Sequence, residues 1–290
     1  MNSIEAINKS TWSEKWAEYR KRPGSFIMFI FVHLATLITV LSIGFLLVYV
    51  LVKGIPNLNA DIFSWEYTSD NCSLVPALIN TVYMTLLSLL IAGPIGIFAA
   101  IYLVEYAKTG NKLVGVVRIT AETLTGIPSI VYGLFGMLFF TNACGLRLSL
   151  ISGALTLAIM VLPVIMRTTE EALMAVPKSY REGSFGLGAG KLRTIFKIVL
   201  PSAVPGILSG VILATGRVVG ETAALLFTAG TIAKVAGLMD SGRTLAVHMY
   251  ALSSEGLYMN QMYATGVILM LIVLLINGCS GMIAKKIAKK

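Results

Sequence analysis

Six long apolar runs dominate this sequence and limit what it can fold into. Each has about 20 to 30 residues, and at about 1.5 Å of rise per residue a helix of that length crosses the roughly 30 Å of hydrocarbon in a bilayer. The runs cover about 26–52, 75–104, 113–140, 148–167, 203–230 and 262–284. We therefore expect an all-α integral membrane protein with six transmembrane helices. They form one membrane domain, 26–290, after a cytoplasmic interfacial helix in 1–25.

Composition favours a membrane protein over a water-soluble one. Hydrophobic residues make up 56% of the chain and charged residues only 13%, whereas soluble domains carry about 25% charged residues. The net charge of +9 comes mainly from lysines and arginines in the connections between the apolar runs. Orientation in a membrane requires that placement, so the positive charge is no argument for binding nucleic acid.

The same cations predict how the chain is oriented. Seventeen of the 23 lysines and arginines lie in the N-terminal segment, in 105–112, in 167–202 or at the C-terminus. The alternate connections hold only Lys53, Arg147, Lys234 and Arg243. By the positive-inside rule, both termini and the long connection 168–202 are expected in the cytoplasm.

The connection 168–202 carries a motif of defined spacing. Glycines separate two helix-forming segments, which predicts a helix, a turn at Gly188 and a second helix, with Pro201 as a stop before the next span. The spacing of a glutamate, a glycine and an Ile-x-Leu-Pro sequence resembles the EAA loop of ABC importer permeases. The matching positions are Glu182, Gly183, Ser184, Gly188, Ile198, Leu200 and Pro201. Gly183 and Ser184 replace the two alanines of the motif and leave small side chains where a partner would approach.

The resemblance to these permeases implies a fold, a partner and a mechanism. The fold is the type I importer bundle, also called MetI-like. The loop holds a coupling helix that docks in a groove of a separate ATPase subunit and moves with it. ATP and Mg²⁺ bind that ATPase and no cofactor binds this chain, because the segment around Lys191 lacks the residues of a P-loop. Ser, His and Asp form no nucleophile motif, so we expect a transport subunit and not an enzyme.

Two pairs of opposite charges lie inside the apolar runs. Arg118 and Glu122 are in the third run. Arg217 and Glu221 are in the fifth. Each pair has the i, i+4 spacing that brings side chains together on one helix face. Two interpretations are open: the residues line a substrate pathway in which arginine binds an oxyanion, or each pair is a structural link between helices.

Two segments narrow the resemblance further. ETLTGIPSIVYGLFG at 122–136 and GRVVGETAALLFTAG at 216–230 are similar to signatures of the phosphate-specific permeases, the PstA type more than the PstC type. That family implies phosphate import across a bacterial or archaeal cytoplasmic membrane, with a PstC-type permease, a PstB-type ATPase dimer and a PstS-type binding protein as partners. The polar segment 53–74 matches no signature. A sulfate or molybdate permease remains an alternative, since arginine does not distinguish tetrahedral anions. An ion-coupled secondary transporter is a weaker one.

The cysteines and histidines form no metal or redox pattern. A disulfide between Cys72 and Cys144 is one possibility, because both cysteines are predicted to lie on the external side of the membrane. His33 lies within the first span and is given no role. His248 stands alone in an external connection, where a surface position is expected.

Glycines recur in the fifth run at GxxxG spacing. Gly206 and Gly210 form one such pair, and Gly216 and Gly220 form another. Small residues at this spacing let two membrane helices approach closely, so we expect a tightly packed bundle.

Overall fold

A computed structural model describes residues 23–108 and 110–288, and within those ranges every regular element is a helix. The expected interfacial helix near the N-terminus lies outside the described residues. Contacts divide the chain into two compact units, 1–52 and 53–290. Five helices are long and apolar enough to cross a membrane, and a bent pair brings the number to six. The expected all-helical membrane architecture is confirmed.

The first unit contains most of α2, Pro23–Gly54. Its sequence is apolar around the whole circumference, and the described residues of this unit offer the helix nothing to pack against. An apolar helix of 32 residues needs hydrocarbon or another chain around it. The helix coincides with the first predicted span.

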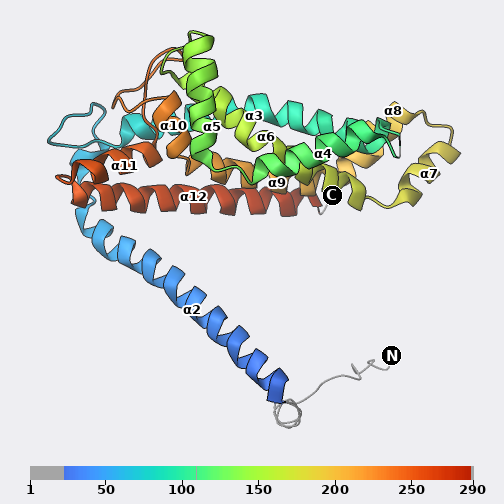
Figure 1. Ribbon diagram of the computed structural model, residues 1–290, viewed down its shortest axis with the longest axis horizontal. Helices are drawn as coiled ribbons and strands as arrows, with labels where there is room; N and C mark the ends of the chain where they lie inside the picture. Colours follow the sequence, from blue (N-terminus) through green and yellow to red (C-terminus); the bar gives the residue numbers. More distant parts are fainter. Residues whose placement is uncertain (1–22, 109, 289–290) are drawn as a thin grey trace. The chain divides into compact units, whose positions relative to one another are not determined.

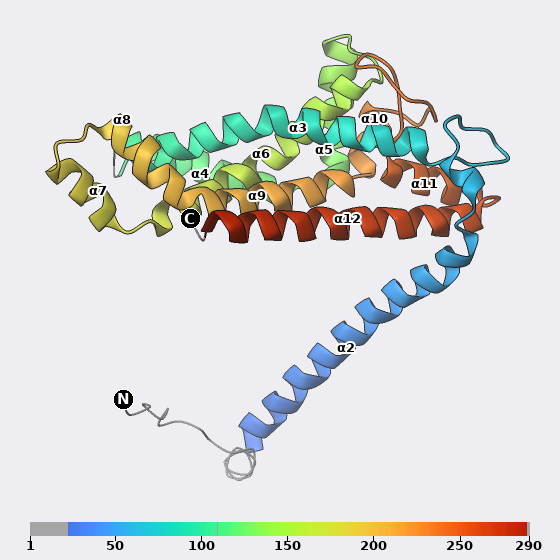
Figure 2. The same cartoon turned by 180° about the vertical axis from the view of Figure 1, so that it is seen from behind.

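The second unit is a bundle built around α6, Leu150–Ala175. Figures 1 and 2 show α6 beside α3 (Val75–Ile101) and α9 (Leu200–Val219), and α9 beside α12 (Met259–Ala288). Apolar side chains of α6 fill the centre of the core. Those that are completely buried are Leu150, Ala154, Leu157, Met160, Val161, Ile165 and Leu173.

Close contact between α9 and α6 depends on one of the two GxxxG pairs. A Cβ atom at Gly206 would lie 2.6 Å from Ala172 Cβ, and one at Gly210 would lie 1.9 Å from Thr168 Oγ1. Both distances are shorter than atoms tolerate, so glycine is required there. Gly216 meets nothing within 4 Å. The prediction of tight packing is confirmed for the first pair, whereas Gly216 has no such close neighbour.

The third predicted span, 113–140, is not one straight helix. It consists of α4 (Lys112–Thr125) and α5 (Ser129–Gly136), which are bent by 104° and followed by the π-helical segment η4, Met137–Ala143. Pro128 explains the break, because proline lacks an amide hydrogen and disfavours helical geometry at the residue before it. The Tyr132 hydroxyl donates to Leu124 O at 2.8 Å and so links α5 to a carbonyl in the last turn of α4.

The helices on either side of the connection 168–202 extend beyond their predicted ends. The fourth reaches Ala175 instead of 167, and the fifth runs from Lys191 to Val219 instead of 203–230. Hydropathy detects only the apolar part of a helix, and the charged turns continue past it. The predicted stop at Pro201 is wrong: the helix passes through it, after a π-helical turn η5 at Ile195–Val199.

Between these long helices, the predicted helix, turn and helix are confirmed. The first is α7, Lys178–Gly186, and the second begins at α8, Lys191–Thr194. Gly188 has φ +81°, a left-handed conformation that glycine adopts without a steric penalty. In Figure 1 this segment lies at one end of the bundle, and α10 (Ala223–Thr228) and α11 (Leu245–Glu255) lie toward the other.

The end opposite α7 is formed by two connections that pack on α3. The first contains the short 3₁₀ helices η1 (Ile55–Asn57) and η2 (Ala60–Phe63). The second contains α10 (Ala223–Thr228) and leads to α11 (Leu245–Glu255). The buried side chain of Asn80 holds the second connection to α3. It donates to Lys234 O and Arg243 O at 2.8 and 3.1 Å and accepts from Ala236 N at 3.0 Å.

Candidate substrate pathway and coupling site

A charged cavity of about 250 Å³ lies between α4 and α6. Two arginines and three glutamates dominate its wall. The lining residues are Arg118, Ala121, Glu122, Met166, Arg167, Glu170, Glu171 and Met174. Two of the predicted pathway residues, Arg118 and Glu122, therefore belong to one polar cavity.

Arg118 pairs across the cavity and not along its own helix. Its Nη2 lies 2.5 Å from Glu170 Oε1 on α6, and no ion pair with Glu122 forms in the described part of the chain. The Glu170 side chain is 8% exposed and that of Arg118 is 47% exposed. Removing the arginine would leave a buried carboxylate without a counter-charge, which is costly. The i, i+4 pairing expected for Arg118 is thus wrong.

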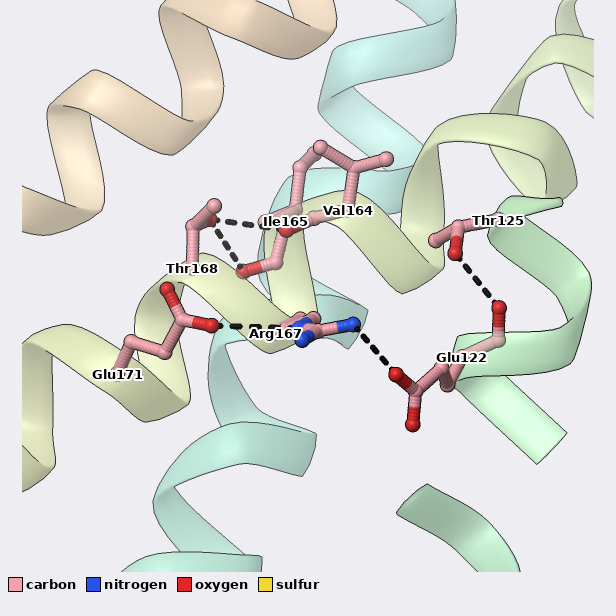
Figure 3. A network of polar contacts seen from close by, with 7 residues as sticks. All are labelled: Glu122, Thr125, Val164, Ile165, Arg167, Thr168 and Glu171. Carbon is pink, nitrogen blue, oxygen red and sulfur yellow. Dashed lines mark hydrogen bonds and ion pairs between the residues drawn. The ribbon is translucent and has the colours of Figure 1, made fainter. Parts of the chain in front are cut away.

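Arg167 occupies the middle of the cavity wall and contacts two glutamates (Figure 3). Its Nε lies 3.2 Å from Glu171 Oε1, and its Nη1 lies 3.4 Å from Glu122 Oε1. All three side chains are more than half exposed. Ion pairs as exposed as these contribute roughly 0–1 kcal/mol each, so they exchange partners at little cost.

Three of the charges in this cavity are absent from the sequence-based candidates. Arg167, Glu170 and Glu171 fall at or beyond the predicted end of the fourth span, in the predicted cytoplasmic connection. The available signal is the segment RTTEEALMA, in which charges three and four residues apart precede the next proline by several residues. That spacing predicts a continued helix with a charged face.

The second predicted pair, Arg217 and Glu221, is separated by the end of α9. Arg217 is half-buried in the last turn, and Glu221 follows the helix. Glu221 Oε1 instead accepts a hydrogen bond from Ala224 N at 3.0 Å, which caps the start of α10. Among the described residues Arg217 has no ion-pair partner within 4.0 Å. Its pairing with Glu221 is therefore also wrong, and the guanidinium is available to a ligand or another chain.

Arg217 lies near the break between α4 and α5. Its positive charge acts on the Tyr132 hydroxyl, which belongs to α5. The glycines of α5 bring α10 close: a Cβ atom at Gly133 would lie 2.8 Å from Ala224 Cα. The two predicted signature segments thus meet in space at two short helices that follow breaks in the chain.

The coupling-loop residues form an exposed helix with apolar side chains. On α7, Tyr180 and Phe185 are about half exposed, and Leu187 in the following turn is 90% exposed. Glu182 and Gly183 are exposed beside them. Exposed aromatic and aliphatic side chains next to a charge are typical of a protein interface.

Ser184 does not face the exposed side of α7, which corrects the prediction for this position. It is 4% exposed, and its hydroxyl shares a 2.8 Å hydrogen bond with Thr194 Oγ1 on α8. Gly183 has open space around it, as expected. Further along, Ile198 and Leu200 are half-buried, whereas Pro201 is exposed.

His248 is buried, contrary to the surface position expected from its sequence context. Its ring is fully covered on α11 and contacts the edge of the Tyr67 ring at 6.0 Å between centroids. The Arg243 guanidinium lies over the same Tyr67 ring at 4.5 Å. Burial lowers the pKa of His248 to about 3, and the nearby Arg243 charge acts in the same direction.

All three cysteines are free, so the disulfide left open by the sequence does not form in this structure. The Cys72 thiol donates to Ser69 O at 3.3 Å. Nowhere in the described ranges do three His, Cys, Asp or Glu side chains gather as metal ligands would.

Comparison with known proteins identifies the family. Residues 92–289 match the model of the binding-protein-dependent transport system inner membrane component. The probable ABC transporter permease protein YqgI of Bacillus subtilis is 34% identical over 244 residues, which is 77% of this chain and 81% of that protein. The phosphate transport system permease protein PstA of Haemophilus influenzae is 31% identical over 250 residues, 84% of this chain and 88% of that protein.

Solved structures share the fold at lower identity. A chain of the MetNI methionine ABC transporter in an inward-facing conformation aligns with a TM-score of 0.60 at 22% identity, covering 74% of this chain and 95% of that one. A chain of a bacterial alginate ABC transporter aligns with a TM-score of 0.65 at 16% identity, covering 94% and 98%. The MetI-type fold is thereby confirmed. This chain belongs to the family of inner membrane permease components of binding-protein-dependent ABC importers.

Proposed function

We propose that this chain is one of the two permease subunits of an importer for inorganic phosphate. The similarity to phosphate permeases of the PstA type over 84% of the chain carries the proposal. The aligned length is sufficient to include the arginine-containing segments and the coupling loop. A PstC-type permease then completes the channel, a PstS-type protein delivers phosphate, and a PstB-type ATPase dimer binds ATP and Mg²⁺.

The coupling surface on α7 supports a partnership with an ATPase. Tyr180, Phe185 and Leu187 are exposed there without being part of the apolar belt of a spanning helix. We assign the ATPase contact to this surface with Glu182 and Gly183. Gly188 sets the turn behind it, and Ile198, Leu200 and Pro201 connect it to the membrane helix.

The arginines supply the chemistry that an oxyanion requires. We assign Arg217, Glu221, Arg118 and Glu122 to the substrate pathway and add Arg167. A guanidinium offers a planar array of donors that matches two oxygens of phosphate. Arg217 is the primary candidate because no carboxylate of the described chain neutralises it.

The proposed mechanism is alternating access without covalent chemistry in this chain. ATP-driven closure of the partner subunits displaces α7, and the breaks at α4–α5 and α9–α10 allow the helix ends to reorient. Phosphate near Arg217 then changes its exposure from one side of the membrane to the other. Both termini and α7 lie in the cytoplasm in this scheme.

The test is ATP-dependent uptake of labelled phosphate into vesicles. The vesicles carry this chain with its co-expressed permease and ATPase, and the binding protein is added outside. We expect uptake that excess sulfate or molybdate does not reduce. Transport of sulfate or molybdate in place of phosphate would keep the family and overturn the substrate. Uptake that persists without the ATPase would contradict ATP-driven import.

A further inference from the structure

The coupling helix α7 has almost no apolar anchor in this chain. Of its nine residues, only Ser184 is buried, and that side chain is polar. Two sets of polar contacts hold the helix on the bundle. One is the hydrogen bond between Ser184 and Thr194. The other is made by Arg181, so apart from the backbone at its two ends α7 is connected to the membrane helices mainly through these side chains.

Arg181 connects α7 to the ends of two other helices. Its Nε and Nη2 donate to Glu105 Oε1 at 3.0 and 2.7 Å. Its Nη1 donates to Val176 O and its Nη2 to Leu173 O, both at 2.9 Å. Leu173 belongs to the last turn of α6 and Val176 follows its last residue, so the guanidinium binds the carbonyls at this helix end. All three guanidinium nitrogens are therefore used, which a lysine cannot imitate.

Glu105 belongs to the π-helical turn η3, Tyr102–Tyr106, which continues α3. The ion pair is sheltered: the side chains of Glu105 and Arg181 are 9% and 18% exposed. A pair this buried is screened little by salt, and loss of one partner leaves an uncompensated charge. Lys191, at the start of α8, reinforces the same turn, because its ammonium lies 4.7 Å from the centre of the Tyr106 ring.

We propose that Arg181 is a positioning residue that makes α7, α3 and α6 move as one body. The inference rests on the proposed function as an ATP-driven permease. A push or pull on α7 is passed to α3 through Glu105 and to α6 through its terminal carbonyls. Because α3 and α6 pack along most of their length, the movement extends into the membrane core.

The first test measures transport per ATP hydrolysed in the reconstituted complex. Arg181→Gln and Glu105→Gln are expected to lower phosphate uptake per ATP by about tenfold, because each removes a charge-assisted network. Arg181→Lys keeps the positive charge but loses the planar set of guanidinium donors. Its phosphate uptake per ATP should lie between that of these variants and that of the wild type. Arg193→Gln is the matched control, since Arg193 is exposed on α8 and makes no ion pair within the described residues.

A merely structural role gives a different result. Uptake and ATP hydrolysis would then fall in the same proportion, in step with the amount of complex that co-purifies. That outcome, or wild-type uptake per ATP in Arg181→Gln, would overturn the proposal.

The second test requires neither a variant of the pair nor knowledge of the substrate. Spin labels at the exposed positions Ser179 on α7 and Tyr102 on η3 report the distance between the two elements, after the three cysteines are replaced. We expect the same distance distribution in the nucleotide-free complex and in the complex trapped with ATP and vanadate. A shift larger than the width of the distribution would overturn the proposal. If the wild type fails to take up phosphate while the distance stays fixed, only the proposed substrate is wrong.

Discussion

Arg217 is the residue on which the proposed substrate pathway depends most. Arg217→Gln removes charge-assisted hydrogen bonds to an anion, each of which contributes about 1.5–3 kcal/mol. We expect phosphate uptake to fall by about tenfold to a hundredfold, with the complex still assembling. Uptake in vesicles and co-purification of the subunits measure the two effects. Arg147→Gln is the control, because Arg147 is exposed and is not part of the proposed pathway.

Charge reversal separates this role from a structural one. Arg217→Glu should abolish uptake and leave the subunits associated. If the Arg217→Glu variant no longer associates with its partner permease, Arg217 is an interface residue, and its assignment to the substrate pathway is contradicted.

His248 predicts a dependence of stability on pH. Its folded-state pKa of about 3 lies below the ordinary value of 6.5, so the folded chain excludes a proton that the unfolded chain binds. The contribution of the neutral His248 ring to the free energy of unfolding is fully present above pH 6.5. It declines by about 1.4 kcal/mol per pH unit as the pH falls from 6.5 toward 3. Thermal unfolding in detergent between pH 7.5 and 4.5 measures the slope. His248→Gln should reduce this slope by about 1.4 kcal/mol per pH unit, which is the contribution of one proton. Equal slopes in the variant and the wild type would contradict the burial of a neutral His248 ring.

The packing of α6 against α9 gives a prediction for a whole element. Gly210→Ala places a methyl group where Thr168 Oγ1 lies 1.9 Å away, so the helices must separate. Overpacking of this kind costs about 1–3 kcal/mol, and the unfolding temperature in detergent should fall. Gly216→Ala is the matched control on the same helix, because nothing lies within 4 Å of the added atom. Equal effects of both changes would contradict the close contact.

The turn between α7 and α8 gives a prediction about coupling. Proline fixes φ near −65°, and Gly188 has φ +81°. Gly188→Pro should therefore displace α7 and abolish uptake while the chain remains in the membrane. Uptake assays and membrane fractionation measure the two effects. Gly190→Ala, in the same connection but outside the assigned ATPase contact, adds a methyl group in open space and should transport normally. Normal uptake by Gly188→Pro would remove the turn from the mechanism.

The elements could largely be predicted from the sequence, but several of their ends and pairings could not. Apolar length predicts the spans because each helix must cross the bilayer. The same criterion misses the charged turns of α6 up to Ala175 and the break of the third span at Pro128. Spacing along one helix predicts the partner of Arg118 as Glu122. Glu170 is the actual partner because α6 lies against α4, which is information about tertiary contact.

The orientation of the whole molecule can be tested directly. We expect a cysteine at Ser179, on α7, to react with a membrane-impermeant maleimide only after the cells are opened. A cysteine at Asp70, in the connection 53–74, should react in intact cells. Both positions are exposed, and the native cysteines are replaced beforehand. The reverse pattern would contradict the positive-inside assignment of both termini to the cytoplasm.

The balance of charge around the cavity between α4 and α6 bears on the direction of flow. Two guanidinium groups and three carboxylates line it, so the wall carries one negative charge in excess when all five groups are ionised. Inorganic phosphate itself carries between one and two negative charges near neutral pH. In this arrangement the two arginines can contact the anion, while the net charge of the wall limits how tightly it is held. Under the proposed orientation the cavity would hold phosphate only weakly, which suits its release to the cytoplasm and not its storage.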